Sequence, residues 1–191
     1  FGEVTVTDVG DHVGFRDALV TADGRACVAA GDRQLTCIDP TTDEVLSIGG
    51  LPGDWLRAST VPGPDGTVYA STREPDAFFA LSADGDVRDL GQARGYAAAL
   101  ALDPSGETFF YMPDAHGGAW QDGAPIIAVD TATGREEIVV RLADSIDDAF
   151  GLRVGGTYNI ATDGERVFVA LNVGRGEESF GEVVLAVVHL P

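Results

Sequence analysis

The stretch Ala128-Val129-Asp130-Thr131-Ala132-Thr133-Gly134 carries an apolar run into an Asp-rich turn, and this pattern recurs along the chain. Equivalent turns follow Ile38 and Leu81. A turn in which Gly follows a small residue precedes each of them and occurs once more, at Asp23-Gly24, Asp65-Gly66, Ser105-Gly106 and Asp163-Gly164. The first three of these glycines are 42 and 40 residues apart. Repeats of this length with several short strands each are typical of β-propeller blades, so the sequence predicts an all-β fold.

The runs between these turns are rich in Val, Ile, Phe and Tyr and are bounded by Gly, Pro and Asp, as strands are. We therefore predict one domain over residues 1–191, with about four blades of four antiparallel strands. The blades cover residues 10–49, 50–91, 92–143, and 144–191 together with 1–9. No apolar period of 3.6 residues lasts beyond two turns, so no helix is predicted.

The last blade has three predicted strands, at residues 158–162, 166–171 and 183–190, whereas a strand-like run at residues 3–9 precedes the first blade. The simplest arrangement uses this N-terminal strand to complete the last blade, which closes the ring and removes an exposed edge. Four blades are at the lower end of the range for propellers. The alternative is a larger ring, completed by further blades or by a second chain.

The chain is strongly acidic, with 31 Asp and Glu against 12 basic residues, all of them Arg, and a formal net charge of −19. This charge repels nucleic acids and anionic membranes, and no basic patch is present, so nucleic-acid binding is excluded. The longest unbroken apolar run, residues 183–188, is far too short to span a bilayer, so no membrane insertion is expected.

Two cysteines, Cys27 and Cys37, flank a tight connection at residues 31–34. On neighbouring strands of a hairpin they would lie opposite each other, where a disulfide is geometrically possible. An even number of cysteines suits an exported protein and predicts an extracellular or periplasmic location. The alternative is a pair of buried free thiols.

Function is expected on one face of the ring. The connections between the second and third strands of each blade share this face with those that lead to the next blade; we call it the loop face. The tight Asp and Gly turns lie on the opposite face, the turn face, where these residues serve as turn formers. Gly106 and Gly164 are 58 residues apart, and the surplus falls in two loop-face connections, residues 113–125 and 143–157. Long connections on a rigid scaffold are where binding sites usually lie.

The first long connection contains Asp114, His116, Trp120 and Asp122. One interpretation is a site in which Asp114, His116 and Asp122 hold a metal or a polar substrate, with Trp120 as a stacking wall. The alternative is an ordered surface loop whose Trp packs on a neighbouring blade. The second connection is rich in acids whose oxygens suit calcium or another divalent metal, although a solvated acidic loop explains them as well. These acids are Asp144, Asp147 and Asp148.

The innermost strands begin on the loop face, so Arg57, Tyr96 and Tyr158 are expected around the central channel. Arg57 together with Arg73 and Arg94 would form a local cationic spot that favours a carboxylate or phosphate group. Salt bridges to the many acids are the alternative. Two further loop residues, Trp120 and Arg175, are expected near the same region. The predicted ligand-binding set is therefore Arg57, Arg73, Tyr96, Trp120, Tyr158 and Arg175.

The 128–134 stretch and the preceding Thr108-Phe109-Phe110-Tyr111 resemble the YVTN, NHL and SMP-30/gluconolactonase-like propeller repeats. This resemblance covers nearly the whole chain but concerns architecture. Some members of the SMP-30-like group are metal-dependent lactonases or esterases with acidic and Asn ligands at the channel mouth. By position, the resemblance implies this ligand role for Asn159 and Asn172.

No catalytic signature, such as G-x-S-x-G or H-E-x-x-H, occurs in the chain. We therefore expect a secreted or periplasmic binding module that recognises a protein, a glycan or a small polar ligand through its loop face. The alternative is a metal-dependent hydrolase of the lactonase or esterase type.

Overall fold

The computed structural model describes residues 17–29, 32–176, 178 and 180–191, and these form four antiparallel sheets. The first sheet contains β1 (Leu19–Val20), β2 (Ala26–Ala29), β3 (Gln34–Ile38) and β4 (Val45–Gly49). The second contains β5 (Trp55–Ser59), β6 (Val68–Arg73), β7 (Ala77–Leu81) and β8 (Val87–Gln92). The third contains β9 (Ala101–Leu102), β10 (Thr108–Tyr111), β11 (Pro125–Asp130) and β12 (Glu136–Arg141). The fourth contains β13 (Arg153–Thr162), β14 (Arg166–Gly174) and β15 (Glu182–His189).

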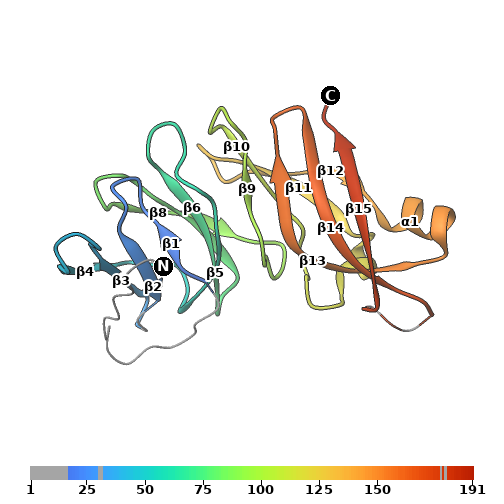
Figure 1. Ribbon diagram of the computed structural model, residues 1–191, viewed down its shortest axis with the longest axis horizontal. Coiled ribbons are helices and arrows are strands. Elements are labelled where there is room, and N and C mark those ends of the chain that lie inside the picture. The colour runs from blue at the N-terminus through green and yellow to red at the C-terminus, as the bar shows by residue number, and fades with distance from the viewer. Residues whose placement is uncertain (1–16, 30–31, 177, 179) are drawn as a thin grey trace, which may run out of the picture.

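The four sheets follow one another in chain order, from the first at the left of Figure 1 to the fourth at the right. Their buried side chains form three clusters, and each cluster joins two neighbouring sheets. Leu35 and Phe79 belong to the cluster of the first and second sheets, and Phe78 and Phe109 to that of the second and third. Within the described residues no such cluster joins the fourth sheet to the first. The all-β fold of four propeller blades is therefore confirmed.

The proposed closure of the ring by residues 3–9 falls on residues outside the described part of the chain. The fourth sheet has three described strands, and no described strand pairs with the free edge of β15. Val183 and Leu185 of β15 are 71% and 67% exposed, whereas Val169 and Leu171 on the opposite face of this sheet are fully buried. The fourth sheet thus has one face in the core and one apolar face uncovered by described residues.

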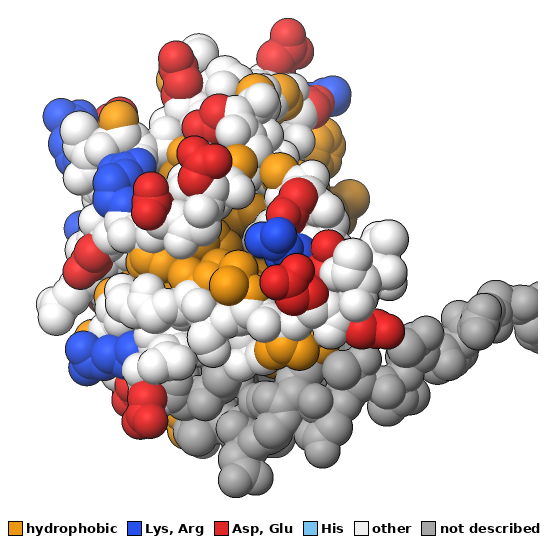
Figure 2. All heavy atoms as spheres, turned by 90° about the vertical axis from the view of Figure 1, so that its left-hand side faces the viewer, with side chains coloured by type: hydrophobic (Ala, Val, Ile, Leu, Met, Phe, Trp, Pro, Cys, Tyr) orange, Lys and Arg blue, Asp and Glu red, His pale blue; other side chains and the backbone are white. Residues whose placement is uncertain are grey.

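The outer face of the first sheet also shows apolar side chains. Figure 2 presents this end of the molecule, with hydrophobic side chains gathered in its middle and Arg, Asp and Glu side chains around them. Val20 of β1 and Val45 of β4 are half exposed. The charged residues of the first sheet therefore lie at its rim rather than across it.

The prediction that the chain has no helix is wrong. The helix α1 (Ala143–Phe150) and the 3-10 helix η1 (Ala119–Asp122) lie in the two long loop-face connections. Each helix buries a single residue, Ile146 in α1 and Ala119 in η1. The apolar spacing in α1 extends over only eight residues, which is too short for a sequence pattern to indicate a helix clearly. α1 ends at Gly151, whose left-handed backbone with φ of 62° caps the helix.

Two predicted strands of the fourth sheet are too short. β13 begins at Arg153 rather than residue 158, and β14 extends to Gly174. The extra part of β13 contains Gly155-Gly156, which has low strand propensity, and the register shifts near these residues. Pairing with β14 extends the strand where local propensity predicts a loop.

Asp carboxylates of the turn face accept hydrogen bonds from backbone N–H groups. Oδ1 of Asp39 accepts hydrogen bonds from the backbone N–H groups of Thr41 and Thr42, at 2.7 and 3.3 Å. Oδ1 of Asp130 accepts from the side chain and the backbone N–H of Thr133, at 2.6 and 2.8 Å. Hydrogen bonds of this kind hold the pKa values of Asp39 and Asp130 below their usual range. Asp39 and Asp130 therefore form part of the scaffold.

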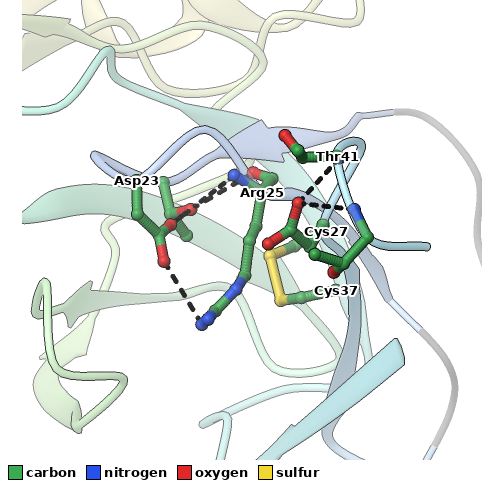
Figure 3. Close-up of polar contacts among 8 residues, drawn as sticks. Asp23, Arg25, Cys27, Cys37 and Thr41 are labelled. Atoms are coloured by element: carbon green, nitrogen blue, oxygen red, sulfur yellow. Dashed lines mark hydrogen bonds and ion pairs between the residues drawn. A yellow bond between two sulfur atoms is a disulfide. The ribbon is translucent and has the colours of Figure 1, made fainter. Parts of the chain in front are cut away.

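The two cysteines form a disulfide, which confirms one of the two alternatives. Cys27 of β2 and Cys37 of β3 are directly opposite each other in register and are fully buried (Figure 3). The bond ties together the two central strands of the first sheet. It is the chain's only cysteine pair, since the sequence has two cysteines.

Replacing both Cys27 and Cys37 by Ala is expected to lower the free energy of unfolding by about 2–3 kcal/mol, because the cross-link restricts the unfolded chain. The measurement is urea unfolding followed by circular dichroism. A reductant should lower the midpoint of the wild type and leave the double variant unchanged. If the urea midpoint of the wild type does not change once reduction of its disulfide has been verified, the disulfide does not stabilise the fold.

The two faces of the fourth sheet are expected to respond differently to the same substitution. Leu171→Ala should cost about 2–5 kcal/mol, because it leaves a cavity in the core between the third and fourth sheets. Leu185→Ala, the matched control on the exposed face, should change the free energy of unfolding by less than about 0.5 kcal/mol. Equal losses in urea unfolding would mean that both faces are covered in solution.

Candidate functional site

Side chains from three blades meet on the loop face. The guanidinium carbon of Arg57, in β5, is 5.1 Å from the ring centroid of Trp55 and 5.4 Å from that of Tyr96. The Tyr96 ring stacks on His116 with centroids 4.5 Å apart. A hydrogen bond of 2.6 Å joins Nδ1 of His116 and the hydroxyl of Tyr158, in β13. We call Trp55, Arg57, Tyr96, His116 and Tyr158 the aromatic ladder.

The fold places Trp55 and Arg57 in β5, Tyr158 in the middle of β13, and Tyr96 and His116 in connections between strands. Arg57 lies at an irregularity in the pairing of β5 with β6, between Leu56 and Ala58, and its guanidinium group lies over the ring of Trp55 in the same strand. Arg57 is buried, whereas Tyr158 is 47% exposed. The ladder thus runs from the interior of the second blade to the surface of the fourth.

Two close backbone contacts hold the His116 loop in place. The N–H of Gly117 donates to the carbonyl of Gly155 at 2.9 Å. Gly156 has a φ of 149°, and a Cβ there would lie 2.5 Å from the carbonyl oxygen of Ala115. Gly155 and Gly156, in the extended part of β13, therefore also allow the 113–125 connection to approach this strand. This approach brings His116 to Tyr158.

A second arginine joins the ladder from the neighbouring strand. The guanidinium carbon of Arg73, in β6, is 5.7 Å from the Trp55 ring centroid, so Trp55 contacts both Arg57 and Arg73. Nε of Arg73 is 3.8 Å from Glu74, in an exposed ion pair of the kind that contributes little to stability. The Arg73 side chain is 45% exposed and available at the surface.

The charged forms of two loop-face carboxylates, those of Asp76 and Asp114, are disfavoured by burial. Burial raises the pKa of Asp76, and the nearby Arg73 and Arg57 only partly oppose this effect. Burial also raises the pKa of Asp114, with a smaller contribution from Asp122. Oδ1 of Asp76 is buried and has no hydrogen-bond partner among the described residues. Such an oxygen is an acceptor suited to a donor on a ligand.

The structure brings together most of the residues predicted to bind a ligand. Arg57, Tyr96 and Tyr158 are in the ladder, and Arg73 contacts Trp55. Trp120 instead lies under Arg153, whose guanidinium carbon is 4.4 Å from its ring. Arg175 pairs with Glu182 at 3.0 Å. Arg94, considered as part of the cationic spot, pairs with Glu136 at 3.7 Å.

The predicted metal ligands are divided between one connection and two strands. Asp114, His116 and Asp122 belong to the 113–125 connection, whereas Asn159 and Asn172 belong to β13 and β14. Asn159 is in register with Ala170, and Asn172 with Gly156 and Val183. In the part of the chain that the structure describes, no three His, Cys, Asp or Glu side chains are grouped so as to hold a metal ion. The metal assignment remains a prediction.

The predicted ligand-binding set does not include Trp55 and Asp76. Trp55 has a visible signal, because it is two residues before the predicted Arg57 and is one of the chain's two tryptophans. Asp76 lies in the short 72–77 connection and has no motif around it. Its importance comes from burial beside Arg73 and Arg57, which only the fold shows.

No protein-family model and no curated protein sequence matches the chain. Its fold is similar to that of a chain in the nidogen/laminin complex, with a TM-score of 0.55 and 10% sequence identity. The match covers 87% of this chain and 64% of that one. For a putative TolB from Agrobacterium tumefaciens the TM-score is 0.59, the identity 14% and the coverage 91% and 57%. For virginiamycin B lyase from Staphylococcus aureus the TM-score is 0.57 and the identity 11%, and the match covers 88% of this chain and 54% of that one.

These similar structures are β-propellers and support the β-propeller assignment. The chain spans less than two thirds of the length of each of these three chains. At 10–14% identity the likeness concerns the fold alone.

Asp76→Asn is expected to raise Tm at pH 7. A carboxyl whose pKa is raised on folding destabilises the protein when ionised, and this loss grows as the pH rises from about 4 through the folded pKa. The gain should therefore disappear near pH 3. Asp130→Asn is the opposite control, because the lowered pKa of Asp130 stabilises the fold at neutral pH. Melting curves between pH 3 and 7 test this, and a Tm of Asp76→Asn below wild type at pH 7 contradicts it.

Proposed function

We propose that this chain is an extracellular or periplasmic recognition module that binds a small polar ligand with a carboxylate or phosphate group at the aromatic ladder. The observation that carries the proposal is the convergence of side chains from three blades, with two arginines in contact with the Trp55 ring. The site is on the loop face, where the connections of the blades vary most in length.

The two arginines have different roles in this proposal. Arg57 is buried and held between Trp55 and Tyr96, so it supplies a fixed positive charge beneath the site. Arg73 is exposed and presents the planar N–H donors that suit the two oxygens of a carboxylate or phosphate. The unpartnered oxygen of Asp76 accepts a hydrogen bond from a hydroxyl or amino group elsewhere on the ligand.

Two further observations support recognition outside the cytoplasm. The disulfide between Cys27 and Cys37 is typical of proteins from oxidising compartments. The similar nidogen/laminin structure is that of a protein complex, which shows a propeller scaffold engaged in recognition. Among the described residues, no helix is long and apolar enough to cross a membrane.

The test is a thermal-shift screen with inorganic phosphate and a panel of mono- and dicarboxylates. The ionic strength is kept constant with NaCl, because a chain with a net charge of −19 is stabilised by salt alone. A ligand at about 100 times its Kd should stabilise the fold by about 2.7 kcal/mol. Arg73→Gln should weaken binding at least about tenfold, the loss expected for a charge-assisted hydrogen bond.

The matched control is Arg135→Gln, an equally charged side chain on the turn face that pairs only with an exposed Glu137. It should bind the ligand as the wild type does. A panel that gives no shift at constant ionic strength, or a shift equally weakened in both variants, rules out anion recognition at the ladder.

A further inference from the structure

A cavity lies away from the aromatic ladder, between the two long loop-face connections. It has a volume of about 410 Å³ and is bordered by η1, α1 and the start of β13. Its lining includes Trp120, Asp144, Asp147, Leu152 and Arg153. This volume is within the range of small-molecule sites in proteins. None of the ladder residues lines this cavity.

One arginine in this cavity is held in place but not neutralised. The guanidinium carbon of Arg153 is 4.4 Å from the centroid of the Trp120 ring. Stacking of this kind orients the guanidinium group without using its N–H donors. Arg153 makes no ion pair or hydrogen bond through its side chain within the described chain, although Asp144 and Asp147 line the same cavity. Its donors are therefore available to a ligand.

The cavity also offers acceptors and an apolar surface. Asp144 and Asp147 are exposed residues of α1, one turn apart on the helix, so their carboxylates face the cavity from one wall. Trp120 is 38% exposed and supplies a flat apolar surface beside the arginine. A ligand here meets donors from one side, acceptors from another and an aromatic ring.

The charges limit the ligand class. An anion is repelled by the two carboxylates, whereas a cation is attracted by them but leaves the N–H donors of Arg153 without an acceptor. A neutral molecule with several hydroxyl groups satisfies both walls, because each hydroxyl donates one hydrogen bond and accepts others. The apolar C–H face of a sugar ring fits against an exposed indole, whereas a flexible open-chain polyol loses more conformational entropy on binding.

We propose that this cavity binds a neutral saccharide of one or two rings, with hydroxyl groups between Arg153 and the carboxylates of Asp144 and Asp147. This site does not rest on the function proposed for the ladder. It concerns other residues and a different class of ligand, so the two proposals fail independently.

The fluorescence of Trp120 gives a direct readout. The chain has two tryptophans, so Trp55→Phe leaves Trp120 as the only one. This variant is titrated with neutral monosaccharides and disaccharides of glucose, galactose and mannose. At least one sugar is expected to give a saturable change in fluorescence, confirmed by saturation-transfer NMR on the wild-type chain.

Arg153→Gln and Asp147→Asn, each in the Trp55→Phe background, should weaken this sugar at least tenfold. Asp147 is exposed on α1, so Asp147→Asn keeps the test valid if Arg153→Gln disturbs the fold. Arg166→Gln is the matched control, because Arg166 also lies over an aromatic ring of the fourth sheet, Phe168, but outside this cavity. It should leave the sugar affinity unchanged.

Three results overturn the proposal. The first is that no neutral sugar in the panel gives a saturable response by either method. The second is that Arg153→Gln and Asp147→Asn, both folded by circular dichroism, bind the sugar as tightly as Arg166→Gln. The third is that choline, guanidinium or acetate saturates the Trp120 signal and no neutral sugar does, which assigns the cavity to a charged ligand.

Discussion

The packing of one sheet against the next is the constraint on which the rest of this structure depends. Every residue of β7 is buried, because one face of this strand meets the first sheet and the other meets the third. Phe78 shows how tightly the layers fit, since its ring makes edge contacts with Phe109 and Tyr111 of the third sheet at 5.1 and 4.9 Å. Closely packed layers allow little relative movement. The third blade and strand β13 of the fourth can therefore hold the rings of Tyr96, His116 and Tyr158 at fixed separations.

The parts of the fold that follow from local chemistry could be predicted from the sequence. The Asp and Gly turns mark the blades because turn geometry depends on a few adjacent residues. Arg57 and Tyr158 were predicted because each belongs to an innermost strand, although Tyr158 lies in the middle of β13 rather than at its start. The rest depends on contacts between distant segments. The early start of β13 depends on pairing with β14, and α1 has a single buried residue to reveal it. Asp76 belongs to the site only because the second blade buries it near Arg57 and Arg73.

The loop face and the turn face shift the pKa values of their carboxylates in opposite directions. On the turn face, backbone N–H groups surround carboxylates such as that of Asp39, and the pKa falls because the charged form is hydrogen-bonded. On the loop face, burial dominates and raises the pKa values of Asp76 and Asp114. The same residue type thus stabilises one face and destabilises the other. Carboxylates that the fold destabilises are common where a protein meets a ligand, since a bound donor can remove the penalty.

This contrast explains why a chain with a net charge of −19 can present a site for an anion. Charges separated by more than about 8 Å are largely screened at physiological ionic strength, so the distant acids of the turn face add little to the potential at the ladder. The local balance is set by Arg57, which is buried and fixed, and by Arg73, against Asp76 and Glu74. A carboxylate with a raised pKa carries less negative charge in mildly acidic surroundings. The positive character of the site should therefore increase as the pH falls toward the pKa of Asp76, and with it the affinity for an anionic group that stays ionised.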